Sequence, residues 1–441
     1  MGERMGEGMS SVRVVNGRVI DPSQDLDRVC DVWIEGSSIL GLGPRAGQQS
    51  DRTIDATGKI VCPGLIDMHV HLREPGHEED ETIATGTSSA LAGGFATIAC
   101  MADTDPPIDT EAGVAFIRAA AQRANNCNVL PVAAVTRGRG GQDLAEMGGL
   151  VDSGAVAFSD DEGPITSAEI MRRALEYSRM FDRPVLTHCE DAELTKEGLM
   201  HEGRLSMMLG LRGMPAAAEE VILYRDLALA ERTGGRLHIL HVSTARSVEL
   251  IREAKRRGVR VTAGACPHHF TLTDESLREY DSNFKVLPPL RTAADIAAII
   301  EGLRDGTIDV IASDHAPHAV EKKQREYALT PFGIIGLETL LPICVTSLVE
   351  PGHLSWSQLI EKLTVGPAKV LGVRKGTLQP GHDADVTIID AAAKWRINSG
   401  RFRSKSRNTP FNGRAVQGRA AMVIVAGEVK LEEAEEDGTL R

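Results

Sequence analysis

Between residues 60 and 317 the sequence alternates strand-like runs with helix-like segments, and this alternation limits the folds that the chain can adopt. Strands that alternate with helices form a parallel sheet, and eight of them favour closure into a (β/α)8 TIM-like barrel. An open doubly wound sheet is the alternative, but no Gly-x-Gly-x-x-Gly follows the first run, which argues against a dinucleotide-binding fold. The eight runs are IVCPGLIDMHVH (60–71), FATIACM (95–101), NVLPVAAVT (128–136), AVAFSD (155–160), PVLTHCE (184–190), LHILHVS (237–243), VRVTAGACP (259–267) and DVIASDHAP (309–317).

The sequence pattern at both ends of the chain differs from that of this middle region. Residues 12–62 contain short strand-like runs broken by turns, and Asn16-Gly17 is a dipeptide typical of a tight hairpin. Similar runs return in GTLQPGHDADVTIID (376–390) and GRAAMVIVAGEVKLEE (418–433). We therefore expect residues 12–61 and 374–441 to form one composite β-sandwich domain, residues 62–373 to form the barrel, and residues 1–11 to be a disordered tail.

The composition excludes several classes of protein. With a net charge of −13, the chain has no excess of basic residues to bind nucleic acid or acidic lipid. Seven cysteines are dispersed and none forms a Cys-x-x-Cys pair, which indicates reduced thiols rather than a disulfide framework. No apolar run approaches the length of a membrane span, and the first ten residues lack the apolar core of a signal peptide. These features predict a globular protein of the cytoplasm that binds neither nucleic acid nor membranes.

Histidines and carboxylates recur at the ends of the predicted barrel strands. In such a barrel the reactive side chains project from the carboxyl ends of the strands, where the loops form one mouth. Because side chains alternate along a strand, His69 and His71 point the same way. Imidazole and carboxylate groups suit Zn²⁺ and related divalent ions, so the pattern predicts a metal site; for one His-x-His pair alone, a solvated polar rim is the alternative. The residues at these strand ends are Asp67, His69, His71, Asp160, Asp161, His188, His241 and Asp314.

Several further motifs are distributed over the chain. In order they are DMHVHLREPG (67–76), AFSDDEG, LTHCED, LHVST, CPHHFTLTD, NFKVLPPLR, SDHAPH (313–318) and TPFGIIGLET. Together they resemble the motifs of the dihydroorotases of the amidohydrolase superfamily, in particular the longer bacterial type, class I, and the resemblance runs from about residue 12 to about residue 430. DMHVHLREPG with SDHAPH is the signature pair of cyclic amidohydrolases of this kind.

The resemblance implies one or two Zn²⁺ ions per subunit. The two histidines of the first strand and Asp314 would hold the more buried ion, and His188 and His241 would hold the second. Many superfamily members bridge the two ions with a carboxylated lysine, but VDSGAVAFSDDEG (151–163) contains no lysine. The chain resembles the dihydroorotases that use an aspartate there, and the spacing to His188 assigns that role to Asp161, with Asp160 as a structural neighbour. The predicted metal ligands are His69, His71, Asp161, His188, His241 and Asp314.

The resemblance also implies a reaction. A metal ion makes hydroxide available near neutral pH and polarises the amide carbonyl of a ring. The carboxylate of Asp314 would act as the general base and then as the general acid for the departing nitrogen. Run in reverse, this chemistry closes N-carbamoyl-L-aspartate into L-dihydroorotate, a step of de novo pyrimidine (UMP) biosynthesis.

Several residues match positions that contact substrate in the family. The guanidinium of Arg73, two residues beyond His71 and on the same predicted face, suits a substrate carboxylate, whereas a surface salt bridge to Glu74 or Glu79 is the alternative. The charged stretch EKKQREYALTPFG (321–333) is either a mobile lid or a solvated loop. The predicted substrate-binding residues are His71, Arg73, Asp103, Leu287, His318, Phe332 and Gly333.

Two of these positions depart from the family pattern. The chain reads MADT (101–104) where MPNT is usual, and NFKVLPPLR (283–291) where NFKMNPPLR is usual, so Asp103 and Leu287 replace asparagines. Asp103 would repel a substrate carboxylate by roughly 1 to 4 kcal/mol at contact distance unless it is protonated or paired. Leu287 offers no hydrogen bond. These changes leave the metal chemistry in place but weaken the assignment of the substrate.

Three functions remain open at this point. The first is dihydroorotase. The second is a related cyclic amidase for hydantoin, allantoin or another ring, which Asp103 and Leu287 favour and the missing lysine disfavours. The third is a non-catalytic dihydroorotase-like partner of aspartate carbamoyltransferase, but such chains typically lose the metal ligands that this chain keeps. A homodimer is the default oligomer, because symmetric dimers are the commonest, and a carbamoyltransferase is the candidate protein partner.

Overall fold

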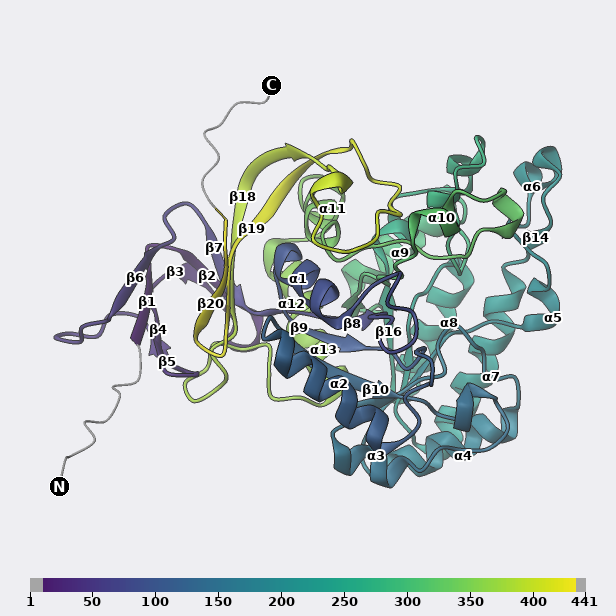
Figure 1. Cartoon of the computed structure of the whole chain (residues 1–441), viewed down its shortest axis with the longest axis horizontal. Helices are drawn as coiled ribbons and strands as arrows, with labels where there is room; N and C mark the ends of the chain where they lie inside the picture. Colours follow the sequence, from purple (N-terminus) through teal and green to yellow (C-terminus); the bar gives the residue numbers. More distant parts are fainter. Residues whose placement is uncertain (1–10, 434–441) are drawn as a thin grey trace.

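The computed structural model describes residues 11–433, in which a β-rich part adjoins a larger α/β barrel (Figure 1). The predicted tail lies outside the described residues except for Ser11, which begins a strand, and residues 434–441 of the predicted sandwich lie outside them as well. Among residues 11–433, no helix has both the length and the apolar character needed to cross a membrane. All seven cysteines are unpaired, as their dispersed positions predict.

The barrel is a sheet of eight parallel strands, and each of the eight predicted runs contributes one of them. The sheet order β17-β16-β15-β12-β11-β10-β9-β8 follows the chain without a reversal. That order confirms the (β/α)8 barrel, because a doubly wound sheet reverses at a switch point. The strands are β8 (Leu65–Val70), β9 (Phe95–Cys100), β10 (Asn128–Ala133), β11 (Ala157–Phe158), β12 (Val185–Thr187), β15 (Leu237–Ile239), β16 (Val261–Ala265) and β17 (Val310–Ile311).

The first and last strands of the barrel meet at the level of the predicted site. The backbone N–H of His71 donates to the carbonyl of His315 at 2.9 Å. The fully buried carboxylate of Asp67 accepts the backbone N–H of Ser313 at 3.1 Å and that of His69 at 3.1 Å. One carboxylate therefore joins the segment that carries both histidines of β8 to the segment that follows β17.

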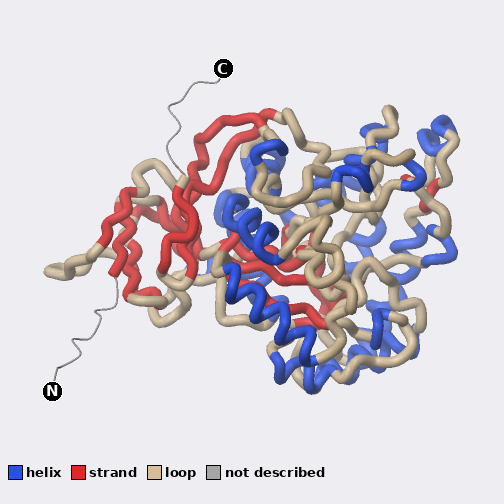
Figure 2. Tube along the Cα trace, in the orientation of Figure 1, coloured by secondary structure: helices blue, strands red, loops and turns tan. Residues whose placement is uncertain are grey.

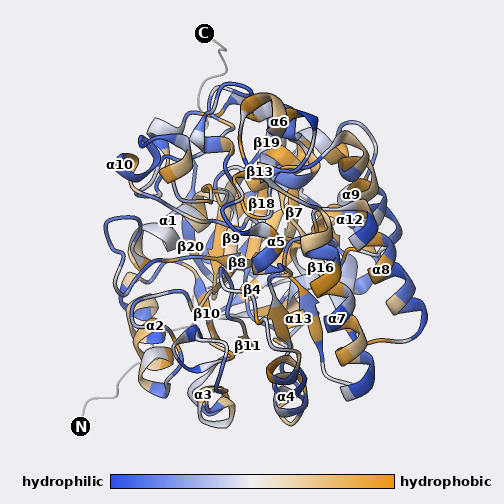
Figure 3. Ribbon diagram, turned by 90° about the vertical axis from the view of Figure 1, so that its right-hand side faces the viewer, coloured by the Kyte–Doolittle hydropathy of each residue, from blue (hydrophilic) through white to orange (hydrophobic). Residues whose placement is uncertain are grey.

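Helices lie around the barrel strands (Figure 2). In α4 the buried positions Met171, Ala174 and Leu175 recur at helical spacing, and the hydroxyl of Ser167 caps the first turn by accepting the N–H of Ile170. Figure 3 shows the apolar strands at the centre with α2, α3, α4, α7 and α8 around them. The longer helices are α1 (Ile83–Gly93), α2 (Glu111–Ala124), α3 (Met147–Ser153), α4 (Ala168–Arg179), α7 (Ala217–Thr233), α8 (Ala245–Arg256), α9 (Ala293–Asp305), α12 (Trp356–Leu363) and α13 (Val365–Leu371). The shorter elements are α5 (Ala192–Thr195), α6 (Arg204–Leu209), α10 (Val320–Lys323), α11 (Leu340–Cys344), β13 (Met200–His201) and β14 (Gly213–Met214).

Both terminal regions contribute to the β-rich part (Figure 1). One sheet has the order β5-β4-β1-β6, and the other, β20-β19-β18-β7-β2-β3, joins strands from the two ends of the chain through the β18–β7 pair. Side chains of both sheets, among them Val14, Ile34, Val386 and Ile424, share one buried cluster. The strands are β1 (Ser11–Val15), β2 (Arg18–Asp21), β3 (Leu26–Val29), β4 (Val32–Glu35), β5 (Ser38–Leu42), β6 (Arg52–Asp55), β7 (Ile60–Pro63), β18 (Val386–Arg396), β19 (Ala415–Val425) and β20 (Glu428–Glu432).

The predicted hairpin at Asn16-Gly17 is wrong. Asn16 has a φ of 64°, as a tight turn requires, but β1 and β2 on its two sides belong to different sheets. A Cβ at Gly17 would lie 2.5 Å from a methyl carbon of Val61, so the absence of a side chain lets the turn pack closely against β7. The dipeptide therefore makes a corner between the two sheets.

The predicted boundary between residues 61 and 62 falls within a strand. β7 ends at Pro63 in the six-stranded sheet and β8 begins at Leu65 in the barrel, so Gly64 joins the two sheets. The loop between β18 and β19, expected within the sandwich, reaches the barrel loops instead. The amide of Asn408 in this loop donates to the carbonyls of Ala316 and Gly333 at 3.0 and 3.1 Å.

Candidate metal centre

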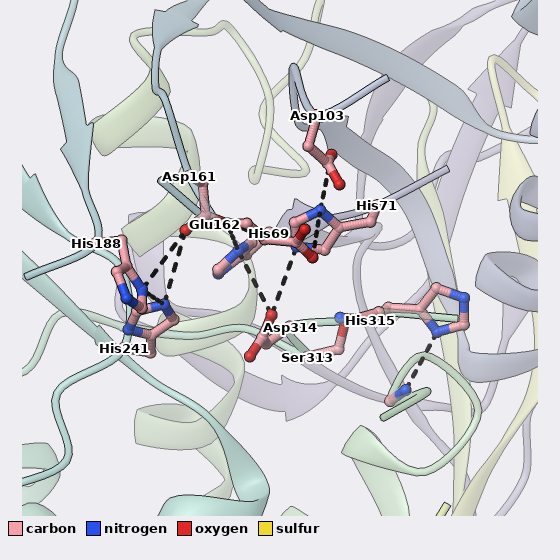
Figure 4. Close-up of polar contacts among 12 residues, drawn as sticks. His69, His71, Asp103, Asp161, Glu162, His188, His241, Ser313, Asp314 and His315 are labelled. Carbon is pink, nitrogen blue, oxygen red and sulfur yellow. Dashed lines mark hydrogen bonds and ion pairs between the residues drawn. The ribbon is translucent and has the colours of Figure 1, made fainter. Parts of the chain in front are cut away.

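The six predicted metal ligands lie together at the carboxyl ends of five barrel strands (Figure 4). None of the six is more than 9% exposed. His69 lies within β8, and each of the others comes one to three residues after a strand ends, so the start of a loop turns it toward the mouth. The ligands and their strands are His69 and His71 (β8), Asp161 (β11), His188 (β12), His241 (β15) and Asp314 (β17).

His69 and His71 face two carboxylates. The Nε2 atom of His69 lies 2.6 Å from Oδ2 of Asp161 and 3.5 Å from Oδ1 of Asp314. The Nε2 atom of His71 lies 3.6 Å from the same oxygen of Asp314 and 3.5 Å from the same oxygen of Asp161. Ligand atoms of His69, His71 and Asp314 lie within 4.8 Å of one another, so these residues could hold one cation.

His188 and His241 form a second group on the other side of Asp161. Nδ1 of His188 and Nε2 of His241 are 3.0 Å apart, and they lie 3.9 and 3.8 Å from Oδ1 of Asp161. Asp161 therefore presents Oδ2 to the first group and Oδ1 to the second (Figure 4). This is the arrangement that a carboxylate between two cations requires.

The protonation of His188 fits a metal ligand. Its Nε2 atom lies 2.7 Å from Oε2 of Glu190, and an ionised carboxylate can only accept a hydrogen bond, so Nε2 carries the proton. In the neutral ring Nδ1 then keeps its lone pair, and Nδ1 is the atom that faces His241 and Asp161. Carboxylates that orient a metal-binding histidine in this way are common in metal sites. The residues present therefore fit a divalent cation.

The charges in the site also favour a cation. Burial would raise the pKa of Asp161, but His69 and His241 outweigh it and hold that pKa well below its usual value. Burial likewise opposes ionisation of Asp314, but the neighbouring histidines lower its pKa. For His69, burial would lower the pKa, yet Asp161 and Asp314 raise it. Two buried carboxylates thus stay ionised near neutral pH, and protons on the imidazoles or a divalent ion must balance them.

Replacing Glu190 by glutamine is expected to weaken metal binding by roughly 10- to 100-fold, because the partner that orients His188 loses its charge. Competition titration against a chromophoric zinc chelator measures this affinity. Glu193→Gln is the matched control, because Glu193 is an exposed carboxylate in the same segment. Equal affinities of both variants and the unchanged protein would show that Glu190 does not position His188.

Sequence reasoning missed Glu190, Glu162 and the role of Asp67. Each of these acids lies within one of the quoted motifs. A motif or its spacing does not indicate which hydrogen-bond donor the carboxylate will bind in the folded chain. Asp160, which precedes Asp161, has a structural role. Its carboxylate accepts hydrogen bonds from the backbone N–H groups of Val135 and Thr136 at 2.8 and 3.1 Å.

Arg73 is buried and paired with two acids. It does not continue the strand alternation, because β8 ends at Val70 and Arg73 has a φ of 61°. Its Nη1 atom lies 2.5 Å from Oδ2 of Asp103, and its Nη2 atom lies 3.1 Å from Oε1 of Glu162. The surface salt bridge considered as the alternative is therefore wrong. Asp103 also lies 2.8 Å from Nδ1 of His71, so the acid expected to repel a substrate carboxylate is paired on both oxygens.

The remaining predicted substrate contacts gather around one loop. Nε2 of His318 lies 2.6 Å from the carbonyl oxygen of Phe332. Gly333 has a φ of 111°, and a Cβ there would lie 2.7 Å from that of Ala316, so only glycine fits the close approach of these two segments. Leu287 is half-buried in a neighbouring loop.

Two buried lysines bind backbone carbonyls of the stretch 321–333, six of whose residues are exposed. Nζ of the buried Lys285 donates to the carbonyls of Tyr327 and Thr330 at 2.8 and 2.7 Å. Nζ of Lys323, also buried, donates to the carbonyls of Pro331 and Gly333 at 3.0 and 3.1 Å. Burial in these carbonyl-lined positions lowers the pKa of Lys285 to about 8.

Comparison with known proteins places the chain in a family. A family model described as Dihydro-orotase-like matches residues 58–247. Proteins named dihydroorotase from Pelotomaculum thermopropionicum and Acetivibrio thermocellus are 53% and 48% identical over 420 residues, which is 95% of this chain and 98% and 99% of theirs. Among solved structures, the L-hydantoinase (dihydropyrimidinase) from Arthrobacter aurescens is 27% identical and covers 97% of each chain with a TM-score of 0.88. The chain therefore belongs to the dihydroorotase family.

Proposed function

We propose that this cyclic amide hydrolase interconverts N-carbamoyl-L-aspartate and L-dihydroorotate at a centre of two zinc ions bridged by Asp161. The dihydroorotase activity rests on relatives that share about half of their residues with this chain over nearly their full length. The observation that supports the metal centre best is the position of Asp161, whose two oxygens face two different histidine groups.

Each group of side chains has a definite task in this proposal. His69, His71 and Asp314 would hold one ion, and His188 and His241 would hold the other. Bound divalent ions would supply an activated water and polarise the ring carbonyl. Asp314 would take up a proton on its carboxylate and pass it to the departing ring nitrogen. Its Oδ2 atom points away from the β8 histidines, 3.9 Å from Nε2 of His268, and is the oxygen that we assign to this transfer.

Arg73 would bind the carboxylate of the substrate. A guanidinium fork matches a carboxylate in geometry and charge, and burial strengthens the attraction because it removes competing water. Asp103 binds Nη1 of Arg73, and Nη2 faces the partly exposed acid Glu162. The loop that carries Phe332 and Gly333 would cover the substrate, anchored by the two buried lysines.

Removal of metal is expected to abolish turnover of dihydroorotate, and added zinc is expected to restore it. The test dialyses the purified protein against a chelator, then assays dihydroorotate, hydantoin and allantoin before and after zinc, manganese or magnesium is added. Turnover of hydantoin alone would favour a cyclic amidase for hydantoin or a similar ring, the function that Asp103 and Leu287 favour in the sequence. Absence of both turnover and metal binding would favour the non-catalytic partner of aspartate carbamoyltransferase.

Location and assembly complete the proposal. Seven free thiols suit the reducing cytoplasm, and a homodimer is the assembly that we propose. Light scattering of the purified protein, alone and mixed with aspartate carbamoyltransferase, measures both the oligomer and the association.

A further inference from the structure

Arg73 lies between two carboxylates, those of Asp103 and Glu162. The two side chains differ in how exposed they are and in how many partners hold them. The side chain of Asp103 is 2% exposed and is also held by Nδ1 of His71 at 2.8 Å. The side chain of Glu162 is 44% exposed, and its ion pair with Arg73 is the longer of the two, at 3.1 Å against 2.5 Å. Glu162 is therefore the partner that can leave Arg73.

The geometry of the guanidinium makes this departure necessary for binding a substrate carboxylate at the same place. With both acids in place, Nη1 of Arg73 faces Asp103 and Nη2 faces Glu162. With Glu162 turned outward, Nη2 of Arg73 is free to donate to another carboxylate. A change of side-chain rotamer is enough for this, so Asp161, the preceding residue, keeps its position.

We propose that Glu162 occupies the place of the substrate carboxylate on Arg73 and acts as an internal competitor that selects for substrates bearing a carboxylate. This inference rests on the proposed function, in which Arg73 binds that carboxylate. A ring without a carboxylate cannot replace Glu162 on the guanidinium. The ion pair between Glu162 and Arg73 therefore stays intact when such a ring enters the site. Selection of this kind raises the KM of the preferred substrate, because each binding event must first break the Glu162–Arg73 pair.

Glu162→Gln tests the competition. The variant is expected to lower the KM for dihydroorotate by roughly threefold to fivefold, as release of a partly exposed ion pair implies. The effect is expected in KM rather than in kcat, because the pair is broken before the chemical step. Glu162→Ala is expected to behave in the same way, and Glu193→Gln, which removes the same charge from an exposed position on α5, is expected to leave KM unchanged.

A second pair of variants separates this inference from the proposed function. Arg73→Met is expected to raise the KM for dihydroorotate, and in that background Glu162→Gln is expected to have no further effect. Arg73→Gln, which also removes the positive charge, serves the same purpose if circular dichroism shows that the methionine variant does not fold. If the Arg73 variants raise KM but Glu162→Gln does not lower it, or lowers it equally in the Arg73 background, the competition is refuted and the substrate role of Arg73 survives. If the Arg73 variants leave KM unchanged, that role fails and the inference fails with it.

Discussion

Replacing Asp161 by alanine is expected to reduce kcat/KM for dihydroorotate by at least about 10³-fold, because the lost metal chemistry is worth several kcal/mol of transition-state stabilisation. Asp161 is 4% exposed, and its oxygens lie 2.6 Å from His69 and 3.8 Å from His241. Without this carboxylate the two histidine groups have no shared anion, and the zinc content is expected to fall together with the rate. Elemental analysis of the purified variant and steady-state kinetics measure the two effects.

Asp160→Asn is the matched control for this prediction. Asp160 is the adjacent carboxylate, but it accepts the hydrogen bonds of Val135 and Thr136 rather than facing the histidines. The Asp160→Asn variant is expected to keep its metal. Its free energy of unfolding is expected to be about 1–3 kcal/mol lower, because the hydrogen bonds to the buried side chain weaken. If Asp161→Ala retains full metal content and activity, or if the control loses the metal instead, the bridging role belongs elsewhere.

Replacing Asp314 by asparagine is expected to lower kcat by roughly 10²- to 10⁴-fold, the usual contribution of a positioned general acid–base group. Asparagine keeps an oxygen near Nε2 of His69 and His71 but cannot accept and return a proton. The expected signature is therefore a large fall in kcat with a smaller change in KM and with most of the metal retained. Stopped-flow or steady-state assays at saturating dihydroorotate give kcat, and the metal content of the same preparation is the control.

Two outcomes would count against this role of Asp314. A variant that keeps more than about a tenth of the kcat would show that another group transfers the proton, and His268, whose Nε2 lies 3.9 Å from Oδ2 of Asp314, would be the next candidate. A variant that loses the rate and the metal together would make Asp314 a ligand without a demonstrated part in proton transfer.

Much of the fold could be predicted from the sequence, because it depends on local patterns. Eight apolar runs separated by amphipathic segments leave little choice but a parallel barrel, and the rule that strand ends carry the chemistry brings His69, His188 and Asp314 to one mouth. His69 and His71 face the same two carboxylates, although β8 ends at Val70 and His71 follows it. These features require no knowledge of which distant segments touch.

What could not be predicted depends on tertiary contacts. Arg73 had acids nearby in sequence, yet it pairs with Asp103 and Glu162, which are 30 and 89 residues away. Asn16 has the backbone conformation of a hairpin turn, but the strands beside it hydrogen-bond in different sheets and bury side chains in the core shared by those sheets, so packing rather than turn chemistry decides their partners. The same is true of Asn408, which lies between two sandwich strands and binds the carbonyls of barrel loops.

Anomalous X-ray diffraction at the zinc absorption edge, from crystals grown with zinc, tests most directly whether Asp161 joins two metal ions. Two peaks are expected, one on each side of the Asp161 carboxylate, each about 2.0–2.2 Å from its nitrogen and oxygen ligands. The first should contact His69, His71 and Asp314, and the second should contact the other two histidines. Peaks that lie away from Asp161, or density for water alone between the two histidine groups, would contradict the bridged metal centre.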